Sequence, residues 1–262
     1  MLKSPIRKHS FDGIDIYEYE EMRLKRPSYL VLGLPDVGLV GAIATKYLAV
    51  NAKMKLVGEL DSSQYLQPIS VVHKGIPLSP FQFYLNQDEN ILVLVAEAPL
   101  PVQAVYPIAK SIVEYAKTLN IDYIISLSGI AIPNRLGVQK PKAYWIATTD
   151  DTAEIMKKSE LKMLDEGFVV GPYAIILKEA KRRSLRNIMI LVESFLDFPD
   201  PEASAEALMV LSKITGIQID VKKLLEEAEL LKLQTRELMK QTKKAMMQMP
   251  KNYEMQMPLM YT

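Results

Sequence analysis

Cysteine is absent from the 262-residue chain, and the only histidines are His9 and His73. The lack of cysteine excludes disulfides, thiolate nucleophiles and the zinc or iron–sulfur sites that need cysteine ligands. Two isolated histidines are too few for a histidine-rich metal site, so we expect no metal and no other cofactor. A chain without cysteine also fits a reducing cytoplasm.

Long apolar runs and an excess of charge are missing as well. No run approaches the roughly 18 apolar residues of a membrane helix, and the first twenty residues are polar, unlike a signal peptide. The net charge is only +1, which gives no overall basic field for nucleic acid or an anionic membrane. We therefore expect a globular, cytoplasmic protein that binds neither.

Short apolar runs alternate with helical patterns between Tyr29 and Gly216. We expect strands at 29–34, 56–61, 69–73, 81–85, 91–97, 123–130, 144–148 and 188–194. We expect helices at 37–51, 102–119, 151–166 and 172–183, and one that starts at the N-cap Asp200 and ends at Gly216. This order predicts an α/β fold in which helices flank a layered, mixed and largely parallel sheet. The consecutive strands between Leu56 and Glu97 predict its antiparallel part.

The C-terminal region has a different pattern of apolar and charged residues. A 3–4 spacing of apolar residues predicts a long amphipathic helix over Val221–Met249, which either lies on its own domain or contacts another subunit. Pro250 ends it, and the Met-rich remainder has no period. We divide the chain into an α/β core (1–219), a C-terminal helix (220–249) and a tail (250–262), which we expect to be extended and mobile unless bound.

Three glycines, Gly33, Gly38 and Gly41, lie at the first strand-to-helix turn. Glycines there allow a phosphate to approach a helix N-terminus. However, their spacing matches neither the P-loop nor the dinucleotide fingerprint. The simpler interpretation is a tight turn with close packing of helix on strand.

Polar groups follow several predicted strands, where open α/β sheets tend to bind ligands. Glu97 and Glu193 would form an acid/base pair only if their strands lie together. Arg135 lies in a loop and is a candidate anion ligand. The candidate strand-end pocket consists of Gly33, Asp36, Gly38, Glu97, Ser128 and Glu193. Ordinary polar side chains at strand ends explain the same pattern.

The motif G-x-P-D-x-G-x-x-G at 33–41, the segment Ser128–Ile130 and the stretch ESFLDFP at Glu193–Pro199 together resemble the archaeal homologues of the proteasome-assembling chaperones. The resemblance covers about residues 20–216. It implies an α/β fold similar to purine nucleoside phosphorylases, but without enzymatic activity. It also implies a homo-oligomer, tetrameric or pentameric, and in some members binding to the proteasome α-ring.

Proteasome activators of this and unrelated families end in hydrophobic–tyrosine–any residue, the HbYX motif. Met260, Tyr261 and Thr262 match it. The resemblance therefore implies a proteasome-binding chaperone or ATP-independent activator that docks these residues on the α-ring. Two alternatives remain open: an enzyme of nucleoside phosphorylase or hydrolase type that uses the strand-end pocket, and a scaffold that binds a homologous chaperone. The tail alternatively packs on its own domain or on a sister subunit.

Overall fold

The structure, a computed structural model, describes residues 4–248. Within this range ten strands form one sheet, and β5 and β6 form a separate hairpin. The strands of the sheet are β1 (Arg7–Phe11), β2 (Ile14–Glu18), β3 (Tyr29–Gly33), β4 (Lys55–Asp61), β7 (Phe81–Asn86), β8 (Ile91–Ala96), β9 (Tyr123–Ala131), β10 (Ala143–Ala147), β11 (Lys162–Met163) and β12 (Asn187–Ser194). The hairpin is β5 (Val71–His73) and β6 (Ile76–Leu78).

The helices are α1 (Val40–Asn51), α2 (Val102–Thr118), α3 (Asp150–Lys157), α4 (Pro172–Arg182), α5 (Pro201–Thr215), α6 (Lys222–Glu226) and α7 (Ala228–Gln248). Two 3₁₀ turns lie at Val37–Leu39 and Arg135–Gly137. The α/β architecture with a C-terminal helix confirms the fold predicted from the sequence.

The strand order of the sheet is β1-β2-β4-β7-β8-β3-β9-β12-β10-β11. Its centre, β8-β3-β9-β12, is parallel, as is the short pair β10–β11. The other five pairings are antiparallel, so the prediction of a largely parallel sheet is wrong in this detail. The reason is that short turns join β1 to β2 and β7 to β8, and a short turn connects only antiparallel strands.

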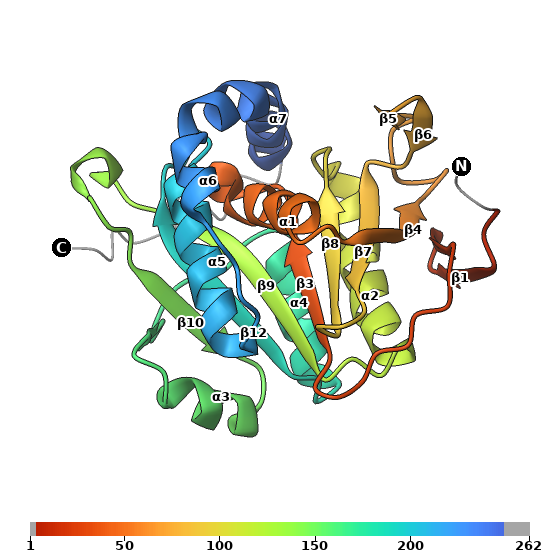
Figure 1. The fold of residues 1–262 in the computed structure, drawn as a ribbon, viewed down its shortest axis with the longest axis horizontal. Coiled ribbons are helices and arrows are strands. Elements are labelled where there is room, and N and C mark those ends of the chain that lie inside the picture. Colours follow the sequence, from red (N-terminus) through yellow and green to blue (C-terminus); the bar gives the residue numbers. More distant parts are fainter. Residues whose placement is uncertain (1–3, 249–262) are drawn as a thin grey trace.

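Helices cover both faces of the sheet (Figure 1). α1 and α5 pack on one face, and α2 and α4 pack on the other. Successive residues of β3 supply both cores, because Val31 faces α1 whereas Leu30 and Leu32 face α2. This double covering explains why the central strands read as continuous apolar runs.

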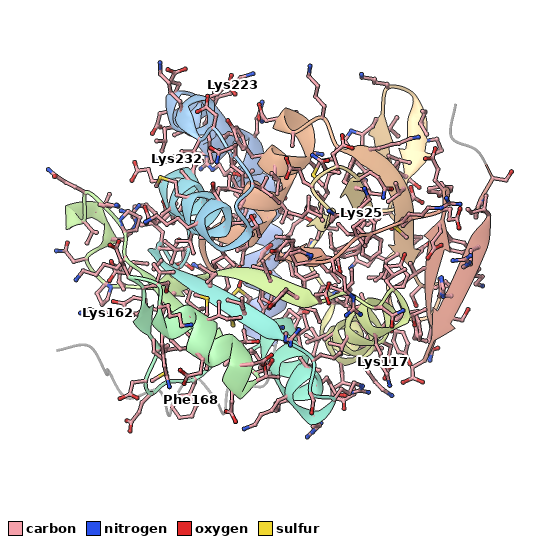
Figure 2. The ribbon with its side chains drawn as sticks, turned by 60° about the horizontal axis from the view of Figure 1, so that its bottom comes forward. Lys25, Lys117, Lys162, Phe168, Lys223 and Lys232 are labelled. Carbon is pink, nitrogen blue, oxygen red and sulfur yellow. The ribbon has the colours of Figure 1, made fainter. Side chains whose placement is uncertain are left out.

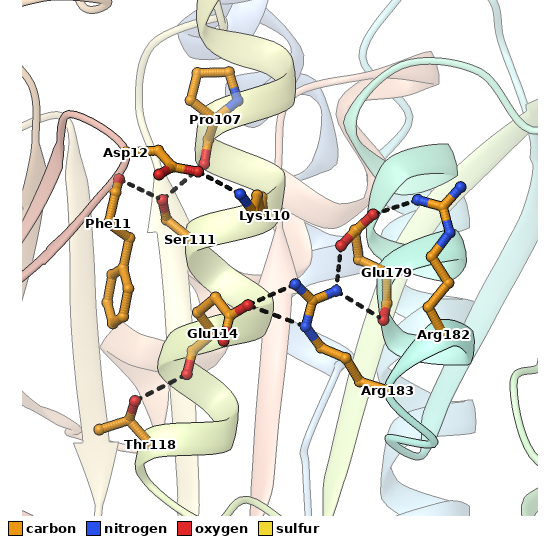
Figure 3. A network of polar contacts seen from close by, with 10 residues as sticks. All are labelled: Phe11, Asp12, Pro107, Lys110, Ser111, Glu114, Thr118, Glu179, Arg182 and Arg183. Atoms are coloured by element: carbon orange, nitrogen blue, oxygen red, sulfur yellow. Dashed lines mark hydrogen bonds and ion pairs between the residues drawn. The ribbon is translucent and has the colours of Figure 1, made fainter.

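A polar network joins α2 to α4 (Figure 3). The Arg183 guanidinium lies between Glu114, 2.5 Å away, and Glu179. Lys110 of α2 pairs with Asp12, and this ion pair attaches the turn after β1 to α2. Lys117, Lys162 and Lys223 lie at different edges of the molecule in Figure 2.

Two predicted helices differ from the structure. The helix predicted at 151–166 ends at Lys157, and residues 162–163 form β11. The indole nitrogen of Trp145 donates to the Leu161 carbonyl (3.1 Å), and the Leu164 amide donates to the Trp145 carbonyl (3.0 Å). These contacts with β10 take the place of helical hydrogen bonds.

The C-terminal helix is also interrupted, because α6 and α7 are separated at Glu227. Leu224 and Met239 are buried in the core that contains α1 and α5. The helix therefore packs on its own domain, as one of the two interpretations predicted. The signals around α5 are confirmed: Asp200 accepts a hydrogen bond from the Ala203 amide, and Gly216 ends the helix with a φ of 76°.

Candidate functional site

The glycine turn after β3 packs directly on neighbouring elements. A Cβ on Gly33 would lie 1.9 Å from Thr45 Oγ1, and one on Gly41 would lie 2.2 Å from the Leu127 carbonyl oxygen. Gly38 has a φ of 63°, and a Cβ there would lie 1.9 Å from Ser194 Oγ. These contacts support the packing interpretation of the glycines, because any side chain would push α1 away from β3, β9 and β12.

Asp36 and Ser128 meet at the carboxyl ends of the neighbouring strands β3 and β9. The Ser128 hydroxyl donates a hydrogen bond to Asp36 Oδ2. Asp36 Oδ1 is buried and has no hydrogen-bond partner in the described part of the chain. Burial raises the pKa of Asp36 well above its usual value, while the Ser128 hydrogen bond opposes that shift. Four predicted pocket residues, Gly33, Asp36, Gly38 and Ser128, are therefore close together.

Tyr173, at the start of α4, supports this turn from the opposite face of the sheet. Its hydroxyl accepts a hydrogen bond from the Leu34 amide (2.8 Å) and donates one to the Leu127 carbonyl (2.7 Å). Burial, and secondarily the charge of Asp36, raises the pKa of this tyrosine. Sequence reasoning missed Tyr173, because a tyrosine after a Gly-Pro helix start carries no signal of its distant partners.

Glu193, at the end of β12, is 8% exposed and held by its neighbours. Its carboxylate accepts hydrogen bonds from the Lys142 amide (2.9 Å) and the Tyr144 hydroxyl (3.1 Å). The side chain lies on the face of the sheet that α2 and α4 cover, because the adjacent Val192 belongs to the opposite core.

Glu97, just after β8, emerges on the α1 face instead. It pairs with Lys46 of α1 and with His73 of the β5–β6 hairpin, each at 2.8 Å. Burial acts to raise the pKa of Glu97, but hydrogen bonds and charge from Lys46 and His73 outweigh it, so the pKa lies below its usual value. Three strand spacings, about 14 Å, separate β8 from β12. The condition for a Glu97–Glu193 acid/base pair is not met.

Arg135 is not an open anion ligand. Its guanidinium is 2% exposed and forms two hydrogen bonds with the Asp200 carboxylate, at 2.7 and 3.0 Å. It also contacts Glu202 at 3.0 Å and the Val138 carbonyl at 2.8 Å. The candidate anion site is therefore an internal ion pair that holds the β9–β10 loop against the N-terminus of α5.

The end of the sheet that carries these groups is crossed by α7 (Figure 1). This helix contacts both α5 and α2, which lie on opposite faces of the sheet. Met239 and Thr242 of α7 are buried, and Lys243 pairs with Asp197 of the β12–α5 loop at 2.7 Å. The C-terminal helix thus covers part of the region where the strand-end pocket was predicted.

The residues of the HbYX match, Met260, Tyr261 and Thr262, lie outside the described residues. Between residues 4 and 248 no group of three or more His, Asp or Glu side chains is arranged to hold a metal ion. No helix in that range is both long and apolar enough to span a membrane.

Comparison with known proteins shows which family this chain resembles. The model of the PAC2 family matches residues 30–239. The chain is 26% identical over 221 residues to an uncharacterized protein of Methanocaldococcus jannaschii, which covers 84% of this chain and 89% of the relative. A crystal structure of Pyrococcus furiosus PbaA, titled an archaeal homologue of proteasome-assembly chaperone, is 32% identical with a TM-score of 0.81, over 89% of this chain and 99% of that chain.

A crystal structure of Pyrococcus furiosus PbaB, titled an archaeal proteasome activator, shares the fold with a TM-score of 0.72. It is 23% identical over 86% of this chain and 98% of that chain. The family model matches well over half of the chain, and the PbaA match covers 89% of it. The chain belongs to the PAC2 family.

Proposed function

We propose that this protein is a non-enzymatic, ATP-independent proteasome-binding chaperone or activator. The observation that carries the proposal is the 32% identity to PbaA, an archaeal homologue of proteasome-assembly chaperone, over 99% of that chain. The geometry of the strand end supports a binding role over catalysis, because Glu97 and Glu193 are held on opposite faces by separate partners.

The docking element in this proposal is the C-terminal Met260–Tyr261–Thr262. Met260 would bury apolar surface, with a contribution of about 25 cal/mol per Å². The ring of Tyr261 adds area, and its hydroxyl can find a partner in the pocket. The Thr262 carboxylate would pair with a lysine between two α subunits, as in other cases of carboxylate capture.

The proposal also needs an oligomer of this chain, a tetramer or a pentamer. A single short tail binds weakly, because ordering it costs conformational entropy. Several tails on one symmetric body bind far more tightly through their high effective concentration. In this arrangement the α/β core forms the body, α7 leads the chain toward the α-ring, and the setting is the cytoplasm. A homologous chaperone is the alternative partner of the scaffold interpretation.

Binding to a matched archaeal proteasome core particle tests the proposal. The full chain should co-elute with the core particle, and a chain that lacks Met260–Thr262 should not. Met260→Ala should weaken binding, whereas Met255→Ala, which changes the same residue type outside the motif, should leave it intact. Equal binding of the full and shortened chains would refute the docking role of the motif.

A further inference from the structure

The two histidines of the chain are each paired with a glutamate, but in different settings. His9 Nε2 lies 2.8 Å from Glu18 Oε1, and the Glu18 side chain is 1% exposed within the body of the protein. His73 Nε2 lies 2.8 Å from Glu97 Oε1, and this pair joins the β5–β6 hairpin to the end of β8. A change of charge on His73 therefore acts on a contact between two separately built parts of the fold.

The hairpin is anchored at its base rather than along its length. Before it, Tyr65 and Leu66 pack against the core under α2. After it, Leu78 is buried, and the Ser79 hydroxyl donates a hydrogen bond to the Leu60 carbonyl (2.5 Å). Between these anchors β5 and β6 form a two-stranded sheet of their own. Such a hairpin is only marginally stable in water, so it depends on contacts with the body.

β5 has little apolar contact with the body. Val72, at its centre, is 64% exposed. The tip is the tight turn Lys74–Gly75, with φ values of 51° and 79°. Among the described residues, the side-chain hydrogen bond that ties β5 to the body is the one between His73 and Glu97. The position of β5 therefore depends on that pair.

Glu97 is an anion under conditions in which His73 changes its charge. Burial acts to raise the pKa of Glu97, but Lys46 and His73 outweigh it, so this pKa lies below its usual value. Lys46 of α1 holds the second carboxylate oxygen of Glu97 at 2.8 Å. Histidine side chains gain their proton between about pH 8 and pH 5. The pair is therefore an ion pair at low pH and a hydrogen bond to a neutral ring at high pH.

Two further titratable groups influence this region. Burial, and then the charges of Glu97 and Glu59, raises the pKa of Tyr84 on β7 to about 12, so Tyr84 stays neutral. Burial also raises the pKa of Glu59 on β4, against hydrogen bonds from Tyr19 and the Ser79 backbone. Glu59 is thus the second group whose charge could change at mildly acidic pH, and a variant of His73 separates the two.

We propose that His73 and Glu97 form a pH-sensitive latch that holds the β5–β6 hairpin against the body. Below the titration of His73 the ion pair keeps β5 in place. As the pH rises through that titration, the charge on the ring is lost, Lys46 remains as the counter-ion of Glu97, and the hairpin is released more often. This inference does not depend on the proteasome-related function proposed above.

Amide hydrogen exchange of the full-length chain at pH 5 and pH 8 tests the latch. Protection factors are compared, because they remove the intrinsic effect of pH on exchange. The protection of β5 and β6 should fall about fivefold from pH 5 to pH 8, as expected for one partly exposed ion pair. The protection of β7 and β8 should not change. The fall should follow the NMR titration of the His73 ring and not that of the His9 ring.

Three variants complete the test. His73→Gln keeps a polar side chain but cannot take up charge, so protection of the hairpin should be low at both pH values. The replaced side chain is 39% exposed, which favours folding of the variant. Glu97→Gln removes the other half of the pair and should give the same result. The matched control is His9→Gln, which should keep the pH dependence of the unaltered chain.

Equal protection of the hairpin at pH 5 and pH 8 in the unaltered chain would overturn the proposal. A pH dependence that persists in His73→Gln would overturn it as well, and would assign the effect to Glu59. Loss of the pH dependence in His9→Gln would show that the histidine within the body controls the hairpin instead.

Discussion

At the scale of single residues, the turn after β3 requires glycine, because neighbouring atoms occupy the space where a Cβ would lie. Gly41 lies so close to β9 that its Cβ would be 2.2 Å from the Leu127 carbonyl oxygen, an atom fixed in the centre of the sheet. Asp36 fills the same turn with a carboxyl group that is mostly buried. The close packing of Gly41 and the burial of Asp36 each affect the free energy of unfolding in a way that can be tested.

Gly41→Ala should destabilise the protein, because α1 must move away from β9 to admit the methyl group. We expect a loss of about 2–4 kcal/mol in the free energy of unfolding, measured by urea denaturation. Gly137→Ala is the matched control, because its Cβ would meet only the side chain of Asn134, which can rotate away. Similar losses in both variants would contradict the packing role of Gly41.

Asp36→Asn should reduce the pH dependence of stability. Burial raises the pKa of Asp36, so the folded chain keeps this proton at pH values where the unfolded chain has lost it. The free energy of unfolding therefore falls as pH rises from about 4 toward the folded-state pKa. Urea midpoints at pH 5 and pH 8 should differ less in the variant than in the unaltered chain. Parallel pH profiles would show that Asp36 ionises normally.

The sequence predicts which residues end strands, but not which of them meet. Asp36 and Ser128 come together because β3 and β9 are neighbours, although 92 residues separate them. Glu97 and Glu193 belong to the same set of strand-end carboxylates and are kept apart by the order β8-β3-β9-β12. Strand order depends on long-range packing, which local patterns of apolar residues do not encode.

At the scale of elements, the Arg135–Asp200 pair joins two loops that carry exposed apolar residues. Both side chains are almost fully buried, at 2% and 1% exposure, and Asp200 also caps α5. A buried carboxylate that loses its partner is far more costly than a surface one. The pair therefore fixes the position of the β9–β10 loop against the start of α5.

Arg135→Met should lower the free energy of unfolding by about 3–5 kcal/mol, because Asp200 would remain buried and unpaired. Arg186→Met is the comparison, since its pair with Asp151 is about half exposed. We expect that variant to lose at most about 1 kcal/mol. Thermal melts of the two variants measure the difference, and equal losses would contradict the structural role of the buried pair.

Element prediction succeeded where one pattern dominates and failed where patterns compete. The N-cap Asp200 and the stop at Gly216 bound α5 correctly. β1 and β2 were missed, because their residues alternate with charge and lie at the edge of the sheet. The apolar residues after Lys157 fit a helix as well as a strand, and pairing with β10 decides between them.

At the scale of the whole molecule, the chain combines an α/β body, a helix that crosses the end of its sheet, and a C-terminal sequence rich in Met and Tyr. The body belongs to the PAC2 family. In the proposed function, the segment that follows α7 binds a proteasome core particle. We propose that Met260, Tyr261 and Thr262 make the contact with the core particle.

Fluorogenic-peptide hydrolysis by a matched archaeal core particle tests the role of these three residues. We expect the full-length protein to stimulate hydrolysis without ATP. A chain that lacks Met260–Thr262 should not stimulate it, although it keeps the same oligomeric state and melting temperature. Equal stimulation by both proteins would contradict the role of the terminal residues. No stimulation by either protein would contradict the activator function itself.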